Sequence, residues 1–500
     1  MKDLRGQGNI MGRVVYWMAT GGALWFLAAF VVLAFMRAGF GFDIEWIEGL
    51  MVQQTQRVIE GLNLYPPPSG DFVPAPYPPM YFYLSALLSF VFGHGQMPLR
   101  IVSTLSTLGV CAAIFAFVHR ESGKVRPGIL AAGLFAATYS INAYWFDLAR
   151  VDMLFLALVF WAAYFVRFGT RLHHDLAAAA LCVAAVLAKQ SAVLAVVAFS
   201  IWILFKHRRA LPGFVLGGIV IGGAALAAMY ALYGEWFFYY LLHVPASHGI
   251  LQRRLGSFWL DDWLMPFGPA SLIALCYFSR KRKKLNWLSG GDLFYALFFI
   301  ALFVTAFMGR IKVGGADNAM IPLHAGVSLL CGLSIAAVFS ESKTIGRLCL
   351  VLLSIYILQL ATLAYNPARF VPTPEIEQRL KNSLDTLAKI PGDVYVMRDP
   401  NFTAPLGHSC GAHMCTAKDT LYEASLHDDN LQKILKPFEN KAYSAVVIRP
   451  ERIPKYCRKA LLKNYRPSKE CIDVILWQNK KGFTLDRQTI YLPKDEEDEE

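Results

Sequence analysis

The sequence predicts an α-helical polytopic membrane protein with a C-terminal α/β domain outside the membrane. The chain of 500 residues is 56% hydrophobic and only 17% charged, whereas a soluble domain carries about 25% charge. Long apolar stretches recur from Val14 to Tyr365, and a helix that spans a bilayer needs roughly 20 such residues. The composition excludes a disordered chain, a collagen-like chain and a disulfide miniprotein.

Basic residues set the expected topology, because short loops rich in Lys and Arg stay in the cytoplasm. Six clusters lie between the apolar stretches, a distribution that argues against nucleic-acid binding: Lys2/Arg5/Arg13, Arg120/Lys124/Arg126, Arg167/Arg171, Lys206/Arg208/Arg209, Arg280–Lys284 and Lys343/Arg347. With all six inside, about eleven crossings result, near 14–36, 101–118, 128–146, 151–168, 176–188, 190–205, 212–233, 264–279, 292–309, 319–339 and 348–365. The predicted protein is a multi-pass protein of the inner (plasma) membrane with a cytoplasmic N-terminus.

Two apolar segments cannot be simple membrane crossings in this topology. Tyr77–Gly93 is apolar, but a full crossing there would put the Arg120 cluster outside. The sequence therefore predicts a juxtamembrane helix, which lies along the membrane or is partly inserted. Lys189 interrupts a long apolar run, and a charge in the hydrocarbon is costly. We expect two short helices that meet at Lys189, near the outer surface.

The predicted outer segments share an enrichment in acidic residues. Eleven acidic residues of the membrane part fall on this side: Asp43, Glu45, Glu48, Glu60, Asp71, Asp147, Asp152, Glu235, Asp261, Asp262 and Asp317. Because acidic residues count little in the topology rule, their gathering on one face is a separate signal. It suggests an active surface on the outer side.

The chain divides into a membrane domain (1–365), an outer α/β domain (366–490) and an acidic, disordered tail (491–500). Helical spacing is expected over 375–389 and around 459–464, and short strands over 394–396, 445–448 and 473–477. An outside domain can form disulfides, and Cys410–Cys415 and Cys457–Cys471 are the local pairings of its four cysteines. A metal site of these cysteines is the alternative.

Charged residues at the predicted outer surface are the candidates for chemistry. Asp43, Glu45 and Glu48 follow the first span within six residues, and Asp147, Arg150 and Asp152 occupy a short turn. Surface helices and polar turns also carry such charges. A carboxylate can nevertheless act as a general base for an incoming hydroxyl, and a cation such as Lys189 can hold a phosphate leaving group. The implied reaction displaces a lipid-linked phosphate from a sugar carbon.

These segments resemble the GT-C superfamily of polyprenyl-phosphate-sugar-dependent glycosyltransferases, which includes protein O-mannosyltransferases and lipid A aminoarabinose transferases. The resemblance covers roughly residues 14–340. It rests on the acidic motif and on Gly61/Tyr65, Pro78/Pro79/Tyr81, Pro98–Ile101, Arg150/Asp152, Lys189/Gln190 and Gly314/Gly315/Asn318/Pro322. One difference is that many relatives carry adjacent Asp and Glu in the first motif, whereas here the acids are spaced apart.

The resemblance implies a catalytic carboxylate in the first outer loop, a partner acid in the second and a cation that contacts donor phosphate. We assign the catalytic role to Asp43, Glu45, Glu48 and Asp152. Asp43 is the choice for the base by its position in the motif, and Glu48, which opens the surface helix, is a close alternative. Arg150, Lys189, Arg253 and Arg254 are the candidates for binding donor phosphate, and Tyr77, Asp147 and Asn318 for binding substrate. No cofactor is required, although three acids in one motif could bind a divalent cation.

The expected activity is sugar transfer, with inversion, from a polyprenyl-phosphate donor to a hydroxyl on a glycan, a lipid or a protein. A flippase for lipid-linked sugars is the main alternative, and a scaffolding subunit of an envelope complex is another. A flippase does not account for an acidic first loop and a large outer domain, and no inverted repeat is visible in the sequence.

Overall fold

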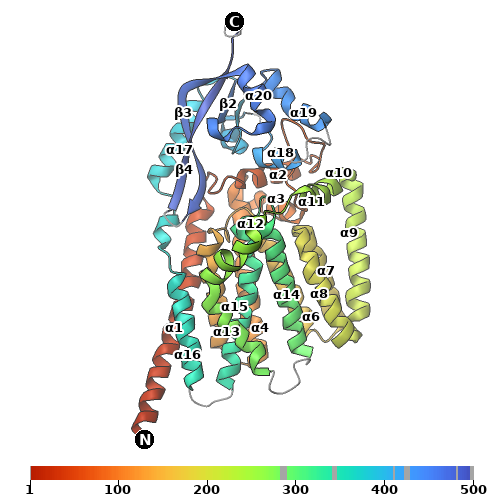
Figure 1. The fold of residues 1–500 in the computed structure, drawn as a ribbon. Coiled ribbons are helices and arrows are strands. Elements are labelled where there is room, and N and C mark those ends of the chain that lie inside the picture. The colour runs from red at the N-terminus through yellow and green to blue at the C-terminus, as the bar shows by residue number, and fades with distance from the viewer. Residues whose placement is uncertain are drawn as a thin grey trace.

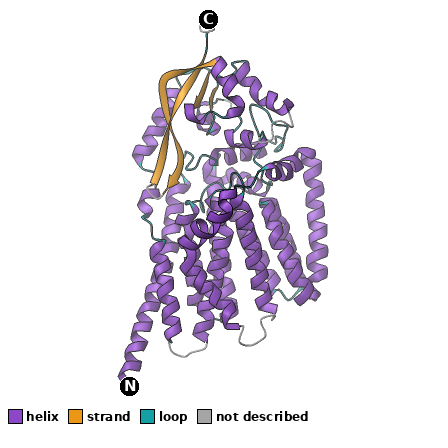
Figure 2. Cartoon of the chain, in the orientation of Figure 1, coloured by secondary structure: helices purple, strands orange, loops and turns teal. Residues whose placement is uncertain are grey.

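The computed structural model describes residues 2–281, 290–340, 346–408, 411–421, 428–479 and 482–495. A long helical bundle carries a mixed domain at one end, and the N-terminus lies at the opposite end of the bundle (Figure 1). Strands occur in the C-terminal domain, whereas the bundle is built of helices (Figure 2). Cys410 and the basic residues Arg282–Lys284 and Lys343 lie outside the described residues.

Each of the eleven predicted spans overlaps a helix of the bundle. These helices are α1 (Lys2–Ala38), α4 (Gln96–Ser122), α5 (Val125–Ala137), α6 (Asp152–Phe168), α7 (Leu172–Ala188), α8 (Val193–Lys206), α9 (Gly217–Tyr233), α13 (Met265–Lys281), α14 (Gly290–Ile311), α15 (Ile321–Ser340) and α16 (Arg347–Thr362). By length and apolar composition five helices of the described chain can cross a membrane, or six if one bent pair is a single span. The count of eleven crossings stays a prediction.

The predicted run 128–146 is only partly helical. Helix α5 ends at Ala137, a 3-10 turn follows over Thr138–Asn142, and Ala143 and Tyr144 adopt positive φ. The buried side chain of Asn142 donates a hydrogen bond to the carbonyl of Thr138. Hydropathy alone did not reveal this change, because most residues of the loop are buried like those at the end of α5.

Two predicted irregularities are confirmed as local structure. Helix α7 ends at Ala188, Lys189 is extended (φ −155°, ψ 124°), and a 3-10 turn over Gln190–Ala192 leads into α8. The segment after Tyr77 forms α3 (Met80–Phe92).

Short helices fill the junction between the bundle and the C-terminal domain, where α2 and α3 lie side by side (Figure 1). The segments of this layer are α2 (Glu48–Ile59), α3, α10 (Glu235–Phe238), η5 (Tyr239–His243), α11 (Val244–Ser247), α12 (Gln252–Ser257), η6 (Phe258–Leu264) and η8 (Asp317–Met320). Helix α2 has no side-chain cap at Ile47, and it buries every residue from Glu48 to Thr55 except Gln53. The acidic motif therefore enters the core rather than solvent.

The C-terminal domain is an α/β domain, as expected. Its sheet has the order β1-β2-β4-β3, in which β1 and β2 are parallel and the other pairs are antiparallel. The elements are η9 (Pro367–Phe370), α17 (Pro374–Leu387), β1 (Val394–Val396), η10 (Pro400–Leu406), α18 (Met414–Thr420), α19 (Asp428–Glu439), β2 (Ala445–Ile448), α20 (Lys455–Asn464), β3 (Tyr465–Asn479) and β4 (Gly482–Pro493). The three predicted strands and both helices are present. Strand β4 was not foreseen, and it runs past the predicted boundary at 490.

The predicted disulfide between Cys457 and Cys471 is wrong. Both thiols are free. Cys457 is fully buried with the side chains that α20 packs on the sheet, whereas Cys471 is half-buried on β3 opposite Thr489. Sequence proximity did not bring them together, because helix and strand present them to different surroundings. Cys415 is also free, and its proposed partner Cys410 lies outside the described residues.

The C-terminal domain is anchored on the first outer loop. The carbonyl of Gly70 accepts hydrogen bonds from the Ala412 amide (2.7 Å) and the Tyr443 hydroxyl (3.2 Å). His413 donates from Nε2 to the carbonyl of Trp46 at 2.8 Å. Because Trp46 lies inside the acidic motif, the domain touches the predicted site directly.

Candidate active site

Glu48 is saturated with hydrogen bonds and forms part of the framework. Its Oε1 accepts from Arg100 Nε (3.0 Å) and the Ala149 amide (2.8 Å), and its Oε2 accepts from Arg100 Nη2 (2.6 Å) and the Ile44 amide (2.7 Å). Burial works to raise the pKa of Glu48, but the Arg100 guanidinium and the backbone donors outweigh it and lower the pKa. A carboxylate with four donors has little capacity left to accept a substrate proton.

Asp43 faces in another direction. Its Oδ2 accepts from the Gly49 amide (2.5 Å) and its Oδ1 from Gln96 Nε2 (2.9 Å). The carboxyl group of Asp399, which follows β1, lies against it, and a Cβ atom on Gly49 would be 2.7 Å from an oxygen of each. Burial, followed by the negative charges of Asp399 and Glu48, raises the pKa of Asp43 well above its usual value.

Glu45 begins a chain of charges that ends at Lys189. Glu45 Oε2 lies 3.2 Å from Arg150 Nη1, and Arg150 Nε lies 3.8 Å from Asp152 Oδ2. Asp152 Oδ1 accepts from Lys189 Nζ at 2.6 Å, and Asp152 Oδ2 accepts from Asn318 Nδ2 at 3.0 Å. The Lys189 side chain is 21% exposed, whereas the two carboxylates are only 2% exposed. The ammonium is therefore the accessible end of the chain.

Burial raises the pKa of Glu45 to about 7, although the neighbouring Arg150 works in the opposite direction. The Glu45 Oε1 atom is buried, and no described residue donates a hydrogen bond to it. The three acids of one motif thus occupy three electrostatic surroundings. Glu48 is ionised and saturated, while Asp43 and Glu45 hold a proton more readily than an ordinary carboxyl group.

Tyr77 and Asp147, which were predicted to bind substrate, lie in different surroundings. Tyr77 lies among the charges of Arg150, Lys189 and Asp152. Asp147 instead accepts from the Tyr139 hydroxyl (2.6 Å) and pairs with Arg37 Nε (3.1 Å), so its two oxygens have partners of their own.

Arg253 and Arg254 lie on α12, apart from this chain of charges. Arg253 is exposed. Arg254 Nη1 donates to the carbonyls of Arg310 (2.8 Å), Lys312 and Gly315. It therefore braces the loop that leads to Asn318. The role in binding donor phosphate stays a prediction for both arginines.

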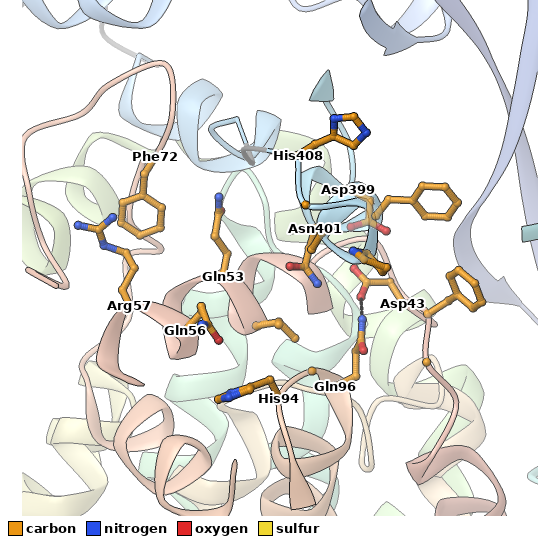
Figure 3. Close-up of a pocket in the computed structure, with 18 of the residues that line it drawn as sticks. Asp43, Gln53, Gln56, Arg57, Phe72, His94, Gln96, Asp399, Asn401 and His408 are labelled. Atoms are coloured by element: carbon orange, nitrogen blue, oxygen red, sulfur yellow. Dashed lines mark hydrogen bonds between the residues drawn. The ribbon is translucent and has the colours of Figure 1, made fainter. Parts of the chain in front are cut away.

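A cavity of about 830 Å³ opens beside Asp43. Figure 3 shows Asp43 and Asp399 close together, with Gln96 and Asn401 beside them and with His94 and His408 nearby. Helix α2 supplies Gln53, Gln56 and Arg57 on another side. The cavity is therefore shared by the first outer loop, the α3–α4 turn and the C-terminal domain.

Three residues of this site, Gln96, Arg100 and Asp399, were not predicted as site residues from the sequence. Arg100 appeared only within a family motif, and Gln96 and Asp399 carried no motif. A weak signal existed for Asp399, since it follows a predicted buried strand, and the carboxyl ends of strands are common places for functional residues. Nothing local indicates that this acid meets Asp43, because the contact joins two domains.

Metal ligation finds little support in the described part of the chain. It contains no group of three or more His, Cys, Asp or Glu side chains that could hold a metal ion. The acids of the first motif do not converge, because Glu48 is turned toward Arg100 and Glu45 toward Arg150. The three acids of the first motif therefore do not form a metal site.

Comparisons with known proteins agree with this architecture. Residues 76–243 match the family described as dolichyl-phosphate-mannose-protein mannosyltransferase. No curated protein matches the chain by sequence.

Two groups of solved structures are similar to the fold. ArnT from Cupriavidus metallidurans is 13% identical in its complex with undecaprenyl phosphate, with a TM-score of 0.57 over 94% of this chain and 98% of that one. The oligosaccharyltransferase AglB from Archaeoglobus fulgidus, in complex with an inhibitory peptide and a dolichol-phosphate, is 10% identical, with a TM-score of 0.53 over 94% of this chain and 76% of that one. The archaeal enzyme has also been solved in complex with Zn and sulfate. These likenesses and the family match together confirm that the chain has the fold of the GT-C superfamily of membrane glycosyltransferases.

Proposed function

We propose that the protein transfers a sugar from a polyprenyl-phosphate donor to an acceptor hydroxyl on the extracytoplasmic face of the membrane. The observation that carries this proposal is the division of the acidic motif. Glu45 faces the chain of charges that ends at Lys189, while Asp43 lines an 830 Å³ cavity. The arrangement offers a cation for a leaving phosphate and a carboxylate for an incoming hydroxyl.

Lys189 and Arg150 are suited to the donor side. Both are cations close to Asp152, and a phosphate that approaches Lys189 meets an ammonium group already fixed by a 2.6 Å hydrogen bond. Fixed positive groups stabilise the charge that develops on a leaving phosphate without reorganising during the reaction. The solved ArnT and AglB complexes contain undecaprenyl phosphate and dolichol-phosphate, which supports a donor of this class.

Asp43 is suited to the acceptor side. Its carboxyl group is buried, oriented by Gly49 and Gln96, and has a raised pKa, as a general base that works near neutral pH requires. A single displacement by the acceptor oxygen inverts the sugar carbon. The basic clusters give the expected orientation, with the N-terminus in the cytoplasm and the C-terminal domain on the extracytoplasmic side.

The test is donor turnover by the purified full chain in nanodiscs. A panel of polyprenyl-phosphate sugars is supplied with a membrane extract as acceptor, and released polyprenyl phosphate and transferred sugar are both measured. Asp43→Asn should lose transfer and Lys189→Ala should weaken it, while the exposed controls Asp385→Asn and Lys381→Ala on α17 should transfer like the wild type.

A flippase gives a different result in the same preparation. No donor would be turned over, and lipid-linked sugar would cross the membrane of proteoliposomes that contain the protein. That outcome would replace the transferase proposal.

A further inference from the structure

The cavity beside Asp43 has walls that suit a particular class of acceptor. Four side-chain amides line it, those of Gln53, Gln56, Gln96 and Asn401. An amide offers both donors and an acceptor, and a sugar hydroxyl likewise donates and accepts. The aromatic ring of Phe72 also lines the cavity, with the Arg57 guanidinium 4.3 Å from its centroid.

Other acceptor classes fit these walls less well. Many peptides are held in proteins by strand addition to a sheet edge or by apolar pockets for anchoring side chains. The apolar side chains Phe42, Val52, Leu62 and Phe402 line the cavity together with the amides and with the ionisable residues Glu60, Asp71, His94 and His408. An anchoring apolar side chain would therefore lie beside polar groups. A lipid tail would leave the buried amide of Gln96 beside a hydrocarbon chain, which is unfavourable.

A buried polar atom also points to a ligand at the floor of the cavity. Asp399 is 5% exposed, and its Oδ1 has no hydrogen-bond donor among the described residues. The other carboxyl group at the floor is that of Asp43, whose oxygens already accept from Gly49 and Gln96. Since buried polar groups are normally satisfied, the pair is suited to a bound hydroxyl group or a shared proton.

We propose that this cavity binds a glycan, and that Asp399 of the C-terminal domain positions Asp43 for proton transfer from a glycan hydroxyl. The inference rests on the proposed glycosyl transfer and narrows its acceptor from a glycan, a lipid or a protein to a carbohydrate. It also gives the C-terminal domain a role in the reaction, because that domain supplies Asp399, Asn401 and His408.

The step balances within the proposed site. The reaction begins with Asp43 ionised beside the Asp399 carboxylate, and burial together with that negative charge raises the pKa of Asp43. The acceptor oxygen forms a bond to the anomeric carbon as the bond from that carbon to the phosphate oxygen breaks, and the bonding electrons leave with polyprenyl phosphate. The hydroxyl proton passes to Asp43, and it is released to water through the cavity.

The first experiment identifies the acceptor class and tests the walls. Two acceptor preparations are compared, the glycolipid fraction of membranes digested with proteinase K and the protein fraction freed of lipid. Labelled sugar should enter the glycolipid fraction. Cleaving the carbohydrate from the lipid should then remove the label from the lipid. Gln56→Ala and Asn401→Ala should raise the acceptor KM about fivefold to tenfold, as expected for one lost hydrogen bond, with the donor KM unchanged.

Gln378→Ala is the matched control for Gln56→Ala. Each glutamine lies on an α-helix and donates to the residue four positions later, but Gln378 is on the exposed surface of α17. It should leave both KM values unchanged. Label in the protein fraction, or an unchanged acceptor KM in both cavity variants, would overturn the glycan proposal while transfer itself continues. Absence of turnover with every donor would instead defeat the underlying transferase function.

The positioning role of Asp399 is tested by the pH profile. Asp399→Asn removes a neighbouring negative charge, so the pKa of Asp43 should fall and the acidic limb of kcat should move down by about one pH unit. A purely structural residue would lower activity without moving that limb. An unchanged limb in active Asp399→Asn protein would overturn the positioning role.

Discussion

Arg100 holds the Glu48 carboxylate in a fork, with Nε 3.0 Å from Oε1 and Nη2 2.6 Å from Oε2. The same guanidinium donates to the carbonyls of Arg37, Phe40 and Phe42. One buried side chain thus ties the end of α1, the acidic motif and α4 together. The backbone amide of Ile44, which lies between Asp43 and Glu45, also donates to this carboxylate, so the fork helps to fix the backbone of the motif.

Glu48→Gln should therefore damage the fold before it damages the chemistry. Breaking one member of a buried ion pair leaves the other charge uncompensated and costs about 3–5 kcal/mol. We expect a large fall in the thermal unfolding temperature, measured by tryptophan fluorescence in detergent. Glu439→Gln, on the exposed end of α19, is the control and should unfold like the wild type. A folded, inactive Glu48→Gln protein would instead assign the base to Glu48.

Asp43→Asn should show the opposite behaviour. The amide keeps an oxygen for the Gly49 amide, so the fold should survive, while general-base catalysis worth about 10²–10⁴ in kcat is lost. Single-turnover transfer measures the chemical step directly. If kcat remained within a factor of a few, the base would have to be sought at Glu45.

The Asp43–Asp399 pair should make stability depend on pH. Burial raises the pKa of both carboxyl groups in the folded protein, with a further contribution from neighbouring negative charges. In the unfolded chain they ionise near pH 4. Above that pH the folded protein binds more protons than the unfolded chain, so its stability falls, by up to about 1.4 kcal/mol per pH unit for each group.

Asp399→Asn removes one of these groups. The variant should therefore gain in unfolding temperature relative to wild type between pH 5 and 7.5, with the difference growing as pH rises. Unfolding scans at several pH values measure it. A difference that shrinks as pH rises would show that Asp399 is ionised and favourably paired in the folded protein.

Lys189→Ala should weaken donor binding, because it removes the accessible cation at the end of the chain of charges that begins at Glu45. It also leaves Asp152 with Asn318 and Arg150 as partners. We expect the donor KM to rise at least tenfold with the acceptor KM nearly unchanged, measured by initial rates. Lys189→Arg should recover part of the donor affinity, since it restores the charge. Equal increases in both KM values would indicate a general disturbance of the site.

Arg254→Ala distinguishes a structural arginine from one that binds phosphate. Its Nη1 donates to three carbonyls of the 310–315 loop. We expect faster hydrogen exchange over 311–318 together with weaker donor turnover. The exposed neighbour Arg253→Ala serves as control and should leave exchange unchanged. A rise in donor KM with normal exchange would support direct phosphate binding by Arg254.

The sequence by itself determined where the long apolar helices lie, where an apolar run breaks at Lys189, and where three of the strands of the C-terminal domain lie. These features follow from hydropathy and periodicity over a few turns of chain, which are local properties. The GT-C likeness was also accessible, because its motifs lie in order along the chain.

The tertiary structure decided what each acid of the motif does. Asp43, Glu45 and Glu48 are indistinguishable in sequence, yet they meet Asp399, Arg150 and Arg100. The tertiary structure also pairs Asp147 with Arg37. The thiols of Cys457 and Cys471 are both free. The physical reason is that a pKa depends on burial and on charges a few ångströms away. Those neighbours come from chain positions up to hundreds of residues distant, which no local pattern records.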